Sequence, residues 1–174
     1  MKRYDLTADM YDERYSLEQA AKYQAALENT KLRGGAILDV GCGTGLFFRH
    51  VAFKAQTVVG VDISRQLLAK AAGQAKELGN VFLLQADADH LPFTECFFEV
   101  AFAFTLLQNM PEPSKTLLEL ERVVAHKGNV IVTGLKRVFP LDQFLEILEL
   151  SDFVCSAFVN DEELKCYVAV LSRP

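Results

Sequence analysis

A glycine-rich segment stands where an apolar run ends, and an acidic residue closes the next apolar run. The segment 39–45 combines Asp39 with Gly41, Gly43 and Gly45, and Asp62 follows the apolar residues 58–61. Glycine has no side chain, so such a turn lets the backbone approach a ligand closely. A carboxylate at the end of the following strand is placed to accept hydrogen bonds from a ribose diol. These features predict a site for a nucleoside-bearing cofactor at the carboxyl ends of parallel strands.

The spacing of the glycines separates two kinds of cofactor. A nicotinamide or flavin dinucleotide fold requires G-x-G-x-x-G, so that the start of a helix faces a pyrophosphate. Here the position that the dinucleotide pattern requires is Leu46, and the chain has no G-x-x-x-x-G-K-[ST] phosphate loop. The segment instead resembles the first motif of the class I S-adenosylmethionine-dependent methyltransferases, in which G-x-G-x-G follows an acidic residue.

The resemblance continues through later segments, in the order and at the intervals of that family. It implies that Asp62 holds both ribose hydroxyls and that Ile63 covers one face of the adenine. It also implies that Asp87 reads the adenine amino group, while the backbone N–H of Ala88 faces a ring nitrogen. Phe104 would end the fourth strand beside the transferable methyl. The cofactor-binding residues implied by the resemblance are Asp39, Gly41, Cys42, Gly43, Gly45, Asp62, Ile63, Asp87, Ala88 and Phe104.

Length and composition predict one soluble domain. The chain has 174 residues, of which 51% are hydrophobic and 24% charged, and its net charge is −5. This size accommodates one sizeable core, and the balance is ordinary for a globular protein. We find no apolar stretch near the roughly 20 residues that cross a bilayer, and no signal-peptide core. The four cysteines lack C-x-x-C spacing, which disfavours a metal site and predicts reduced thiols in a cytoplasmic protein.

Strand and helix patterns alternate along the chain, which predicts an α/β fold with helices on both faces of a mostly parallel sheet. We expect a three-layer Rossmann-like sandwich of seven strands, in which the C-terminal hairpin adds an antiparallel strand. Residues 1–174 would form a single domain, with an N-terminal lid or helix at 1–30 and a core at 36–174. The predicted strands are 36–40, 57–62, 81–85, 100–104, 129–133, 153–159 and 165–171. The predicted helices include one opened by a capping box at Ser16, one capped by Ser64, one starting at Pro113 and turned into a strand by Gly128, and one at 141–150.

The acceptor side of the site is less defined. A sulfonium methyl is already activated, so its transfer chiefly needs a nucleophile held in line at about 3 to 3.5 Å. A base matters only where the acceptor must lose a proton, and no residue is predicted as one. The candidates for substrate contact are Tyr11 and Tyr15 before the first strand, Gln108 and Asn109 after the fourth, and Lys136 after the fifth. Gln108 and Asn109 form hydrogen bonds but do not titrate.

Several functions stay open at this point. Few residues stand between the predicted elements, which favours a large acceptor such as RNA or a protein of translation over a small metabolite. A catalytically silent binding or activator subunit of the same fold is an alternative, although the intact Asp39, Asp62 and Asp87 argue against it. Residues 81–84 are apolar for an edge strand, which predicts that this edge is covered, either by helices, the commoner solution, or by a small activator protein that adds a strand.

Overall fold

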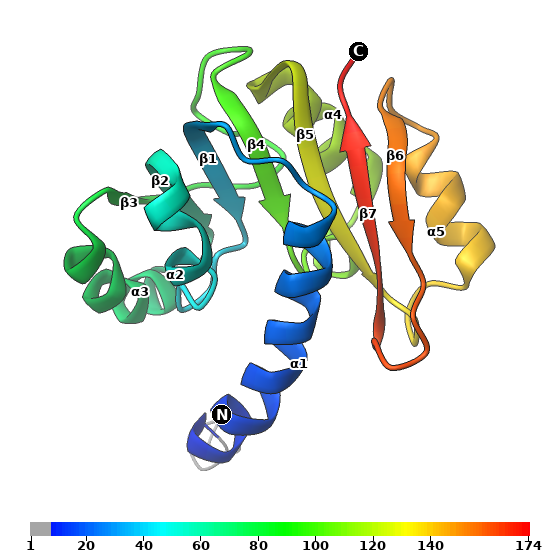
Figure 1. Cartoon of the computed structure of the whole chain (residues 1–174). Helices are drawn as coiled ribbons and strands as arrows, with labels where there is room; N and C mark the ends of the chain where they lie inside the picture. The colour runs from blue at the N-terminus through cyan, green and yellow to red at the C-terminus, as the bar shows by residue number, and fades with distance from the viewer. Residues whose placement is uncertain (1–7) are drawn as a thin grey trace.

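The computed structural model describes the backbone of residues 8–174 and the side chains from residue 18 onward. A seven-stranded sheet forms its centre, in the order β3-β2-β1-β4-β5-β7-β6 (Figure 1). Only β7 runs antiparallel to its neighbours, because it pairs antiparallel with both β5 and β6. The strands are β1 (Gly34–Val40), β2 (Ala55–Asp62), β3 (Val81–Gln85), β4 (Phe98–Ala103), β5 (Val124–Leu135), β6 (Val154–Val159) and β7 (Cys166–Ser172). The predicted fold class is confirmed.

Helices cover both faces of this sheet. The helices are α1 (Ala8–Glu28), α2 (Phe48–Val51), α3 (Arg65–Leu78), α4 (Pro113–Val123) and α5 (Leu141–Leu148), with short 3-10 turns η1 (Ala52–Lys54) and η2 (Leu107–Asn109). Buried residues of α1, α2 and α3 pack in one apolar cluster, and those of α4 and α5 pack in another. The central strands supply both clusters alternately, since neighbouring side chains point to opposite faces of a strand. In β5, for example, Ile131 packs with the first cluster, while Val130 and Val132 pack with the second.

The predicted N-cap of α3 is confirmed. The Ser64 side chain accepts a hydrogen bond from the backbone N–H of Leu67 at 3.3 Å, as an N-cap residue does. Gly79 closes the helix in the left-handed conformation, with φ of 77°, and its N–H donates to the Ala75 carbonyl. This helix packs beside β2 and β3 and fixes where the turn after Asp62 lies.

The prediction for the N-terminal helix was wrong at its start. Helix α1 begins at Ala8 and runs unbroken through Ser16, so Ser16 is not its N-cap. The capping-box pattern is outweighed there because residues 8–15 contain neither glycine nor proline and simply continue the helix. In Figure 1 the N-terminal part of α1, in dark blue, projects past the carboxyl ends of the parallel strands.

The fifth strand is also longer than expected. It begins at Val124, directly after α4, whereas the sequence pattern predicted a helix through Val124 and a turn at Gly128. Gly128 instead lies inside β5, where an added Cβ would stand 2.6 Å from the Glu99 carbonyl oxygen. That close approach, rather than a helix end, is what requires glycine at this position.

Strand β3 lies at the edge of the sheet, as predicted. Its Phe82 side chain is 59% exposed, while Leu83 packs partly against the cluster beneath α3. The exposed phenylalanine is compatible with an added strand or with none, so the activator protein stays a prediction.

Candidate functional site

The glycine loop between β1 and α2 is shaped by three positive φ angles. Gly41, Gly43 and Gly45 have φ of 73°, 55° and 81°, a region that side chains other than glycine rarely adopt. An added Cβ on Gly45 would stand 2.5 Å from the Phe48 ring, so this glycine allows the loop to pack against α2. No atom lies within 4 Å of the place where a Cβ on Gly43 would stand. The backbone is therefore open to a ligand at Gly43 and closed by packing at Gly45.

Asp62 ends β2, and its carboxylate contacts both the glycine loop and the turn that leads into α3. One carboxylate oxygen accepts the backbone N–H of Gly43 at 2.9 Å, and the other accepts that of Ser64 at 2.8 Å. These bonds fix the carboxylate at the loop while leaving it further acceptor capacity, since each oxygen has two lone pairs. The expectation that Asp62 holds a ribose diol is compatible with this orientation.

Asp39 is the acidic residue of the motif, and it is buried at the end of β1. Burial, and secondly the charge of Asp62, raises the pKa of Asp39 to about 7. Its Oδ2 atom is buried and has no hydrogen-bond partner among the described residues. Leaving such an acceptor unpaired is costly, so this atom fits a ligand that brings a donor or a positive charge.

The residues expected around the adenine follow β2 and β3. Ile63 is 68% exposed beside Asp62, an unusual setting for an isoleucine that a flat apolar ligand would cover. Gln85 donates from its amide to the Ile63 carbonyl at 3.0 Å, which brings the end of β3 against this turn. Asp87 is exposed two residues later and accepts the Asp89 N–H at 3.0 Å, while Ala88 is buried. The structure therefore gathers Asp62, Ile63, Asp87 and Ala88 near the carboxyl ends of β2 and β3.

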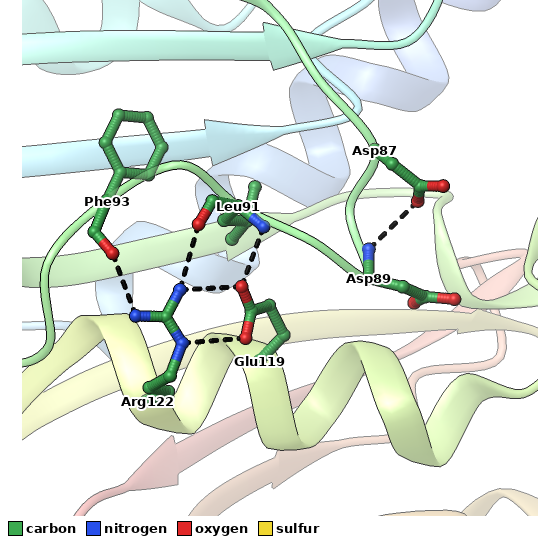
Figure 2. Close-up of polar contacts among 6 residues, drawn as sticks. All are labelled: Asp87, Asp89, Leu91, Phe93, Glu119 and Arg122. Carbon is green, nitrogen blue, oxygen red and sulfur yellow. Dashed lines mark hydrogen bonds and ion pairs between the residues drawn. The ribbon is translucent and has the colours of Figure 1, made fainter.

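An ion pair on α4 holds the loop that carries Asp87, as Figure 2 shows. Arg122 donates to the carbonyl oxygens of Phe93 and Leu91 at 2.8 and 2.9 Å, and it pairs with Glu119 at 2.7 Å. Glu119 in turn accepts the Leu91 N–H at 2.7 Å. These charge-assisted bonds lower the pKa of Glu119, chiefly through Arg122, and fix residues 91–93 against α4. Sequence reasoning missed this pair, because both residues read as an ordinary polar helix face.

Other residues of the glycine loop and the fourth strand are packed inward. Cys42 is a buried thiol whose pKa is raised by burial, which excludes it as a nucleophile. The ring of Phe104 packs against Tyr23, Phe47 and Phe102, so only its backbone faces the rim. The expectation that the end of the fourth strand passes beside the transferable methyl therefore concerns the backbone of Phe104, and it stays a prediction.

The residue after Phe104 is strained and held by other elements. Thr105 has φ of 57°, an outlier for a β-branched residue. Its N–H donates to Thr133 Oγ1 at 2.8 Å, and its Oγ1 accepts a hydrogen bond from Lys22 Nζ at 2.9 Å. Lys22 is only 1% exposed, and burial lowers its pKa. Sequence reasoning missed both residues, although the buried positions 19, 22, 23 and 26 have the spacing of one helix face and place a lysine on it.

The predicted substrate residues lie at different places. Asn109 donates to the Thr105 carbonyl at 2.9 Å, and both amide atoms of Gln108 are buried without a hydrogen-bond partner among the described residues. Lys136 lies beyond β5, donates to the Asp161 carbonyl at 2.5 Å and stands 5.6 Å from the centre of the Tyr167 ring. Tyr11 and Tyr15 fall within α1, but their side chains lie outside the described residues.

In the part of the chain that the structure describes, no group of three or more histidine, cysteine or acidic residues could hold a metal ion. No described helix is long and apolar enough to cross a membrane. All four cysteines are free thiols.

The fold and the glycine loop define a class I methyltransferase-like Rossmann domain, and a comparison with family models agrees. The chain belongs to the methyltransferase-domain family, whose model matches residues 38–132. That range runs from β1 to β5 and includes the glycine loop, Asp62 and Asp87.

Curated relatives match about three quarters of the chain. Phosphatidylethanolamine N-methyltransferase of Cereibacter sphaeroides is 30% identical over 128 residues, which are 72% of this chain and 63% of that protein. A malonyl-[acyl-carrier protein] O-methyltransferase of Erwinia billingiae is 28% identical over 128 residues, covering 74% of this chain and 50% of that protein. The chain thus spans between half and two thirds of the length of these relatives.

Solved structures share the fold. A SAM-dependent methyltransferase from Aquifex aeolicus superimposes with a TM-score of 0.78 at 18% identity, covering 91% of this chain and 98% of that one. The [4+2]-cyclase SpnF superimposes with a TM-score of 0.79 at 23% identity, covering 90% and 82% of the two chains. The second match shows that this fold also serves a protein whose named reaction is not methyl transfer.

Proposed function

We propose that the chain is an S-adenosylmethionine-dependent methyltransferase. The observation that supports this most is the pairing of an open Gly43 with the unpartnered Asp39 Oδ2 at the same loop. A cofactor bearing an ammonium and a sulfonium would supply the donor and the positive charge that Asp39 lacks. A dinucleotide, by contrast, would bring a pyrophosphate toward two carboxylates, Asp39 and Asp62, which repel it.

The residues present fit this cofactor along its whole length. Asp62 would bind the ribose, and Ile63 would cover one face of the adenine. Asp87 would accept from the adenine amino group, and the backbone N–H of Ala88 would face a ring nitrogen. Asp39 and the backbone of Gly41 and Gly43 would face the amino-acid part. When bound, the cofactor supplies an activated methyl group. The protein then needs mainly to hold the acceptor in line and to exclude water, because no strong base is required for an acceptor that is already nucleophilic.

For the acceptor we propose a small molecule or a small group on a carrier. The relatives named above methylate phosphatidylethanolamine and malonyl-[acyl-carrier protein], and further relatives are named ubiquinone biosynthesis O-methyltransferases. This replaces the expectation of an RNA or translation-protein acceptor, which finds no support among those relatives. The net charge of −5 also disfavours tight binding of nucleic acid.

A catalytically silent binding protein is the second candidate, because the fold alone does not specify methyl transfer: the cyclase SpnF shares it. An experiment on label transfer distinguishes the methyltransferase from the silent binding protein. The purified chain is incubated with methyl-labelled S-adenosylmethionine and with lipid, small-metabolite, protein and RNA fractions of its host. We expect label in the lipid or small-metabolite fraction, or on an acyl carrier in the protein fraction, and much less label with an Asp62→Ala variant. Cofactor binding without transfer to any fraction would favour the silent protein, and label in RNA would restore the macromolecular acceptor.

A further inference from the structure

Thr105, just beyond β4, is held through all three of its polar groups by side chains from three other elements. Its N–H donates to Thr133 of β5, its carbonyl accepts from Asn109 of η2, and its hydroxyl accepts from Lys22 of α1, at 2.8 to 2.9 Å. These contacts fix a β-branched residue at φ of 57°. Strain of this kind persists only where the surroundings impose it, and it gathers at ligand sites.

The hydrogen bond from Lys22 determines the direction of the Thr105 hydroxyl proton. A lysine ammonium has donors and no acceptor, so Thr105 Oγ1 must accept from Lys22. The hydroxyl proton is then directed away from Lys22, and within the described residues this hydroxyl donates to no other group. Since Thr105 is only half-buried, a ligand at the rim can reach it.

The Lys22 side chain behind this hydroxyl forms no direct ion pair among the described residues, although Glu18 acts on it electrostatically. Glu18, one turn earlier on α1, is the acidic side chain nearest in sequence, and its carboxylate pairs with Lys165 at 2.5 Å. Lys22 therefore has no ion-pair partner among the described residues.

The position of Thr105 separates it from the nucleoside half of the site. Leu106, the next residue, lies 3.1 Å from where a Cβ on Gly41 would stand, so Thr105 adjoins the glycine loop. Asp62 and Asp87 follow β2 and β3, on one side of β1, whereas Thr105 follows β4, on the other side. A ligand group at Thr105 therefore belongs to the acceptor end of the cofactor.

We propose that the Thr105 hydroxyl binds an anionic oxygen of the acceptor, of carboxylate or phosphate type, and that Lys22 is the positioning residue that directs the hydroxyl proton and supplies the charge. This rests on the proposed methyltransferase function. It restricts the acceptor to molecules that carry an anionic oxygen near the atom to be methylated. The carboxylate of the cofactor itself has the same chemistry, so the test must separate the two sources.

The test uses the full chain saturated with S-adenosylhomocysteine and titrated with acetate or with inorganic phosphate. Binding is followed by the ¹⁵N chemical shift of the Thr105 amide. We expect a saturable shift in the wild type, weakened about tenfold or more by Thr105→Val and by Lys22→Met, the scale of one lost charge-assisted hydrogen bond. Thr105→Ser, which keeps the hydroxyl, should bind the anions within about threefold of the wild type, a smaller change than the loss of a charge-assisted hydrogen bond gives. Thermal unfolding of each variant shows that it is folded.

Binding of S-adenosylhomocysteine and of 5′-methylthioadenosine, which lacks the amino-acid part, distinguishes the sources. Unchanged affinity for both ligands in Thr105→Val and Lys22→Met supports the acceptor assignment. If the variants weaken S-adenosylhomocysteine alone, the site binds the cofactor carboxylate and the proposal is overturned. Equal anion affinity in the wild type and both variants, or no saturable anion shift in the wild type, also overturns it. Failure of the wild type to bind S-adenosylhomocysteine would instead contradict the proposed function, and the anion titration of the ligand-free chain would still report on Thr105.

Discussion

The backbone N–H of Gly43 donates to the Asp62 carboxylate at 2.9 Å, across the gap between β1 and β2. The residue that we expect to bind the ribose therefore also fixes the glycine loop that faces the amino-acid part of the cofactor. A second bond, from the Ser64 N–H at 2.8 Å, keeps the carboxylate from turning away. The two halves of the cofactor site are thus coupled through one side chain.

This coupling predicts the effect of replacing Asp62. Asp62→Ala should weaken S-adenosylhomocysteine binding by about 1.5 to 3 kcal/mol, the scale for hydrogen bonds to a charged group. Asp62→Asn should weaken it less, because its amide oxygen still accepts one backbone N–H. Titration calorimetry measures both, with the exposed Asp152→Ala as a matched control that should bind normally. An Asp62→Ala variant with wild-type affinity would contradict the ribose assignment.

Asp39 predicts a pH dependence of cofactor binding. Burial and Asp62 raise its pKa to about 7, so the free protein holds this carboxyl protonated below that pH. A cationic ligand favours the ionised form, and binding must then release the proton. Affinity for S-adenosylhomocysteine should rise with pH between about 5.5 and 7, by at most about tenfold per unit, and level off above.

The control for this prediction is Asp39→Asn, which has no proton to release. Its affinity should be lower and nearly independent of pH over the same window.

The stability of the free wild type should depend on pH in the opposite direction to its cofactor affinity. The folded chain binds more protons than the unfolded one between about pH 4 and 7, because the pKa of Asp39 is raised on folding. Its free energy of unfolding should therefore receive a falling contribution from Asp39 as pH rises through that window. Binding that strengthens as pH falls would refute the assignment.

Much of this site follows from the sequence, because its parts are local. Glycine spacing and the acids that end β1 and β2 are tied to strand ends, where neighbouring parallel strands bring them together. The Ser64 cap and the Gly79 helix end are local signals of the same kind.

The features that the sequence did not predict depend on contacts between residues far apart in the chain. Lys22 and Thr105 stand 83 positions apart, and no local pattern reports their hydrogen bond. The same is true of Gly128, whose need for glycine comes from the Glu99 carbonyl on the neighbouring strand. At Ser16 a valid local signal was overridden, because the helix had already begun at Ala8.

The ion pair on α4 predicts a second route to weaker cofactor binding. Arg122→Met removes the donors to the Leu91 and Phe93 carbonyls and should free the loop that carries Asp87. We expect a loss of about 1 kcal/mol in unfolding free energy, since the pair is partly exposed. We also expect faster amide hydrogen exchange over residues 87–93 and weaker S-adenosylhomocysteine binding. Arg49→Met breaks an exposed pair with Glu77 and should change none of these. Unaltered exchange in Arg122→Met would show that the pair does not hold the loop.

Lys22 predicts a stabilising substitution. Burial lowers its pKa, so the ammonium is disfavoured in the folded state, and the wild type should gain stability as pH rises toward 10. Lys22→Met removes that cost and should raise the unfolding free energy at pH 7 by about 1 kcal/mol. Urea unfolding at pH 7 and pH 10 measures it, and the difference between variant and wild type should shrink at the higher pH. A variant less stable than the wild type at pH 7 would mean that the bond to Thr105 outweighs the desolvation of the ammonium.

The central claim is that the glycine loop, Asp39 and Asp62 bind S-adenosylmethionine rather than a dinucleotide. Calorimetric titration of the purified chain with S-adenosylhomocysteine and, in parallel, with NAD tests it most directly. We predict one S-adenosylhomocysteine per chain with a dissociation constant in the micromolar range, about −8 kcal/mol, and no heat of binding with NAD. Saturable binding of NAD, or no binding of S-adenosylhomocysteine by the folded chain, would contradict the claim.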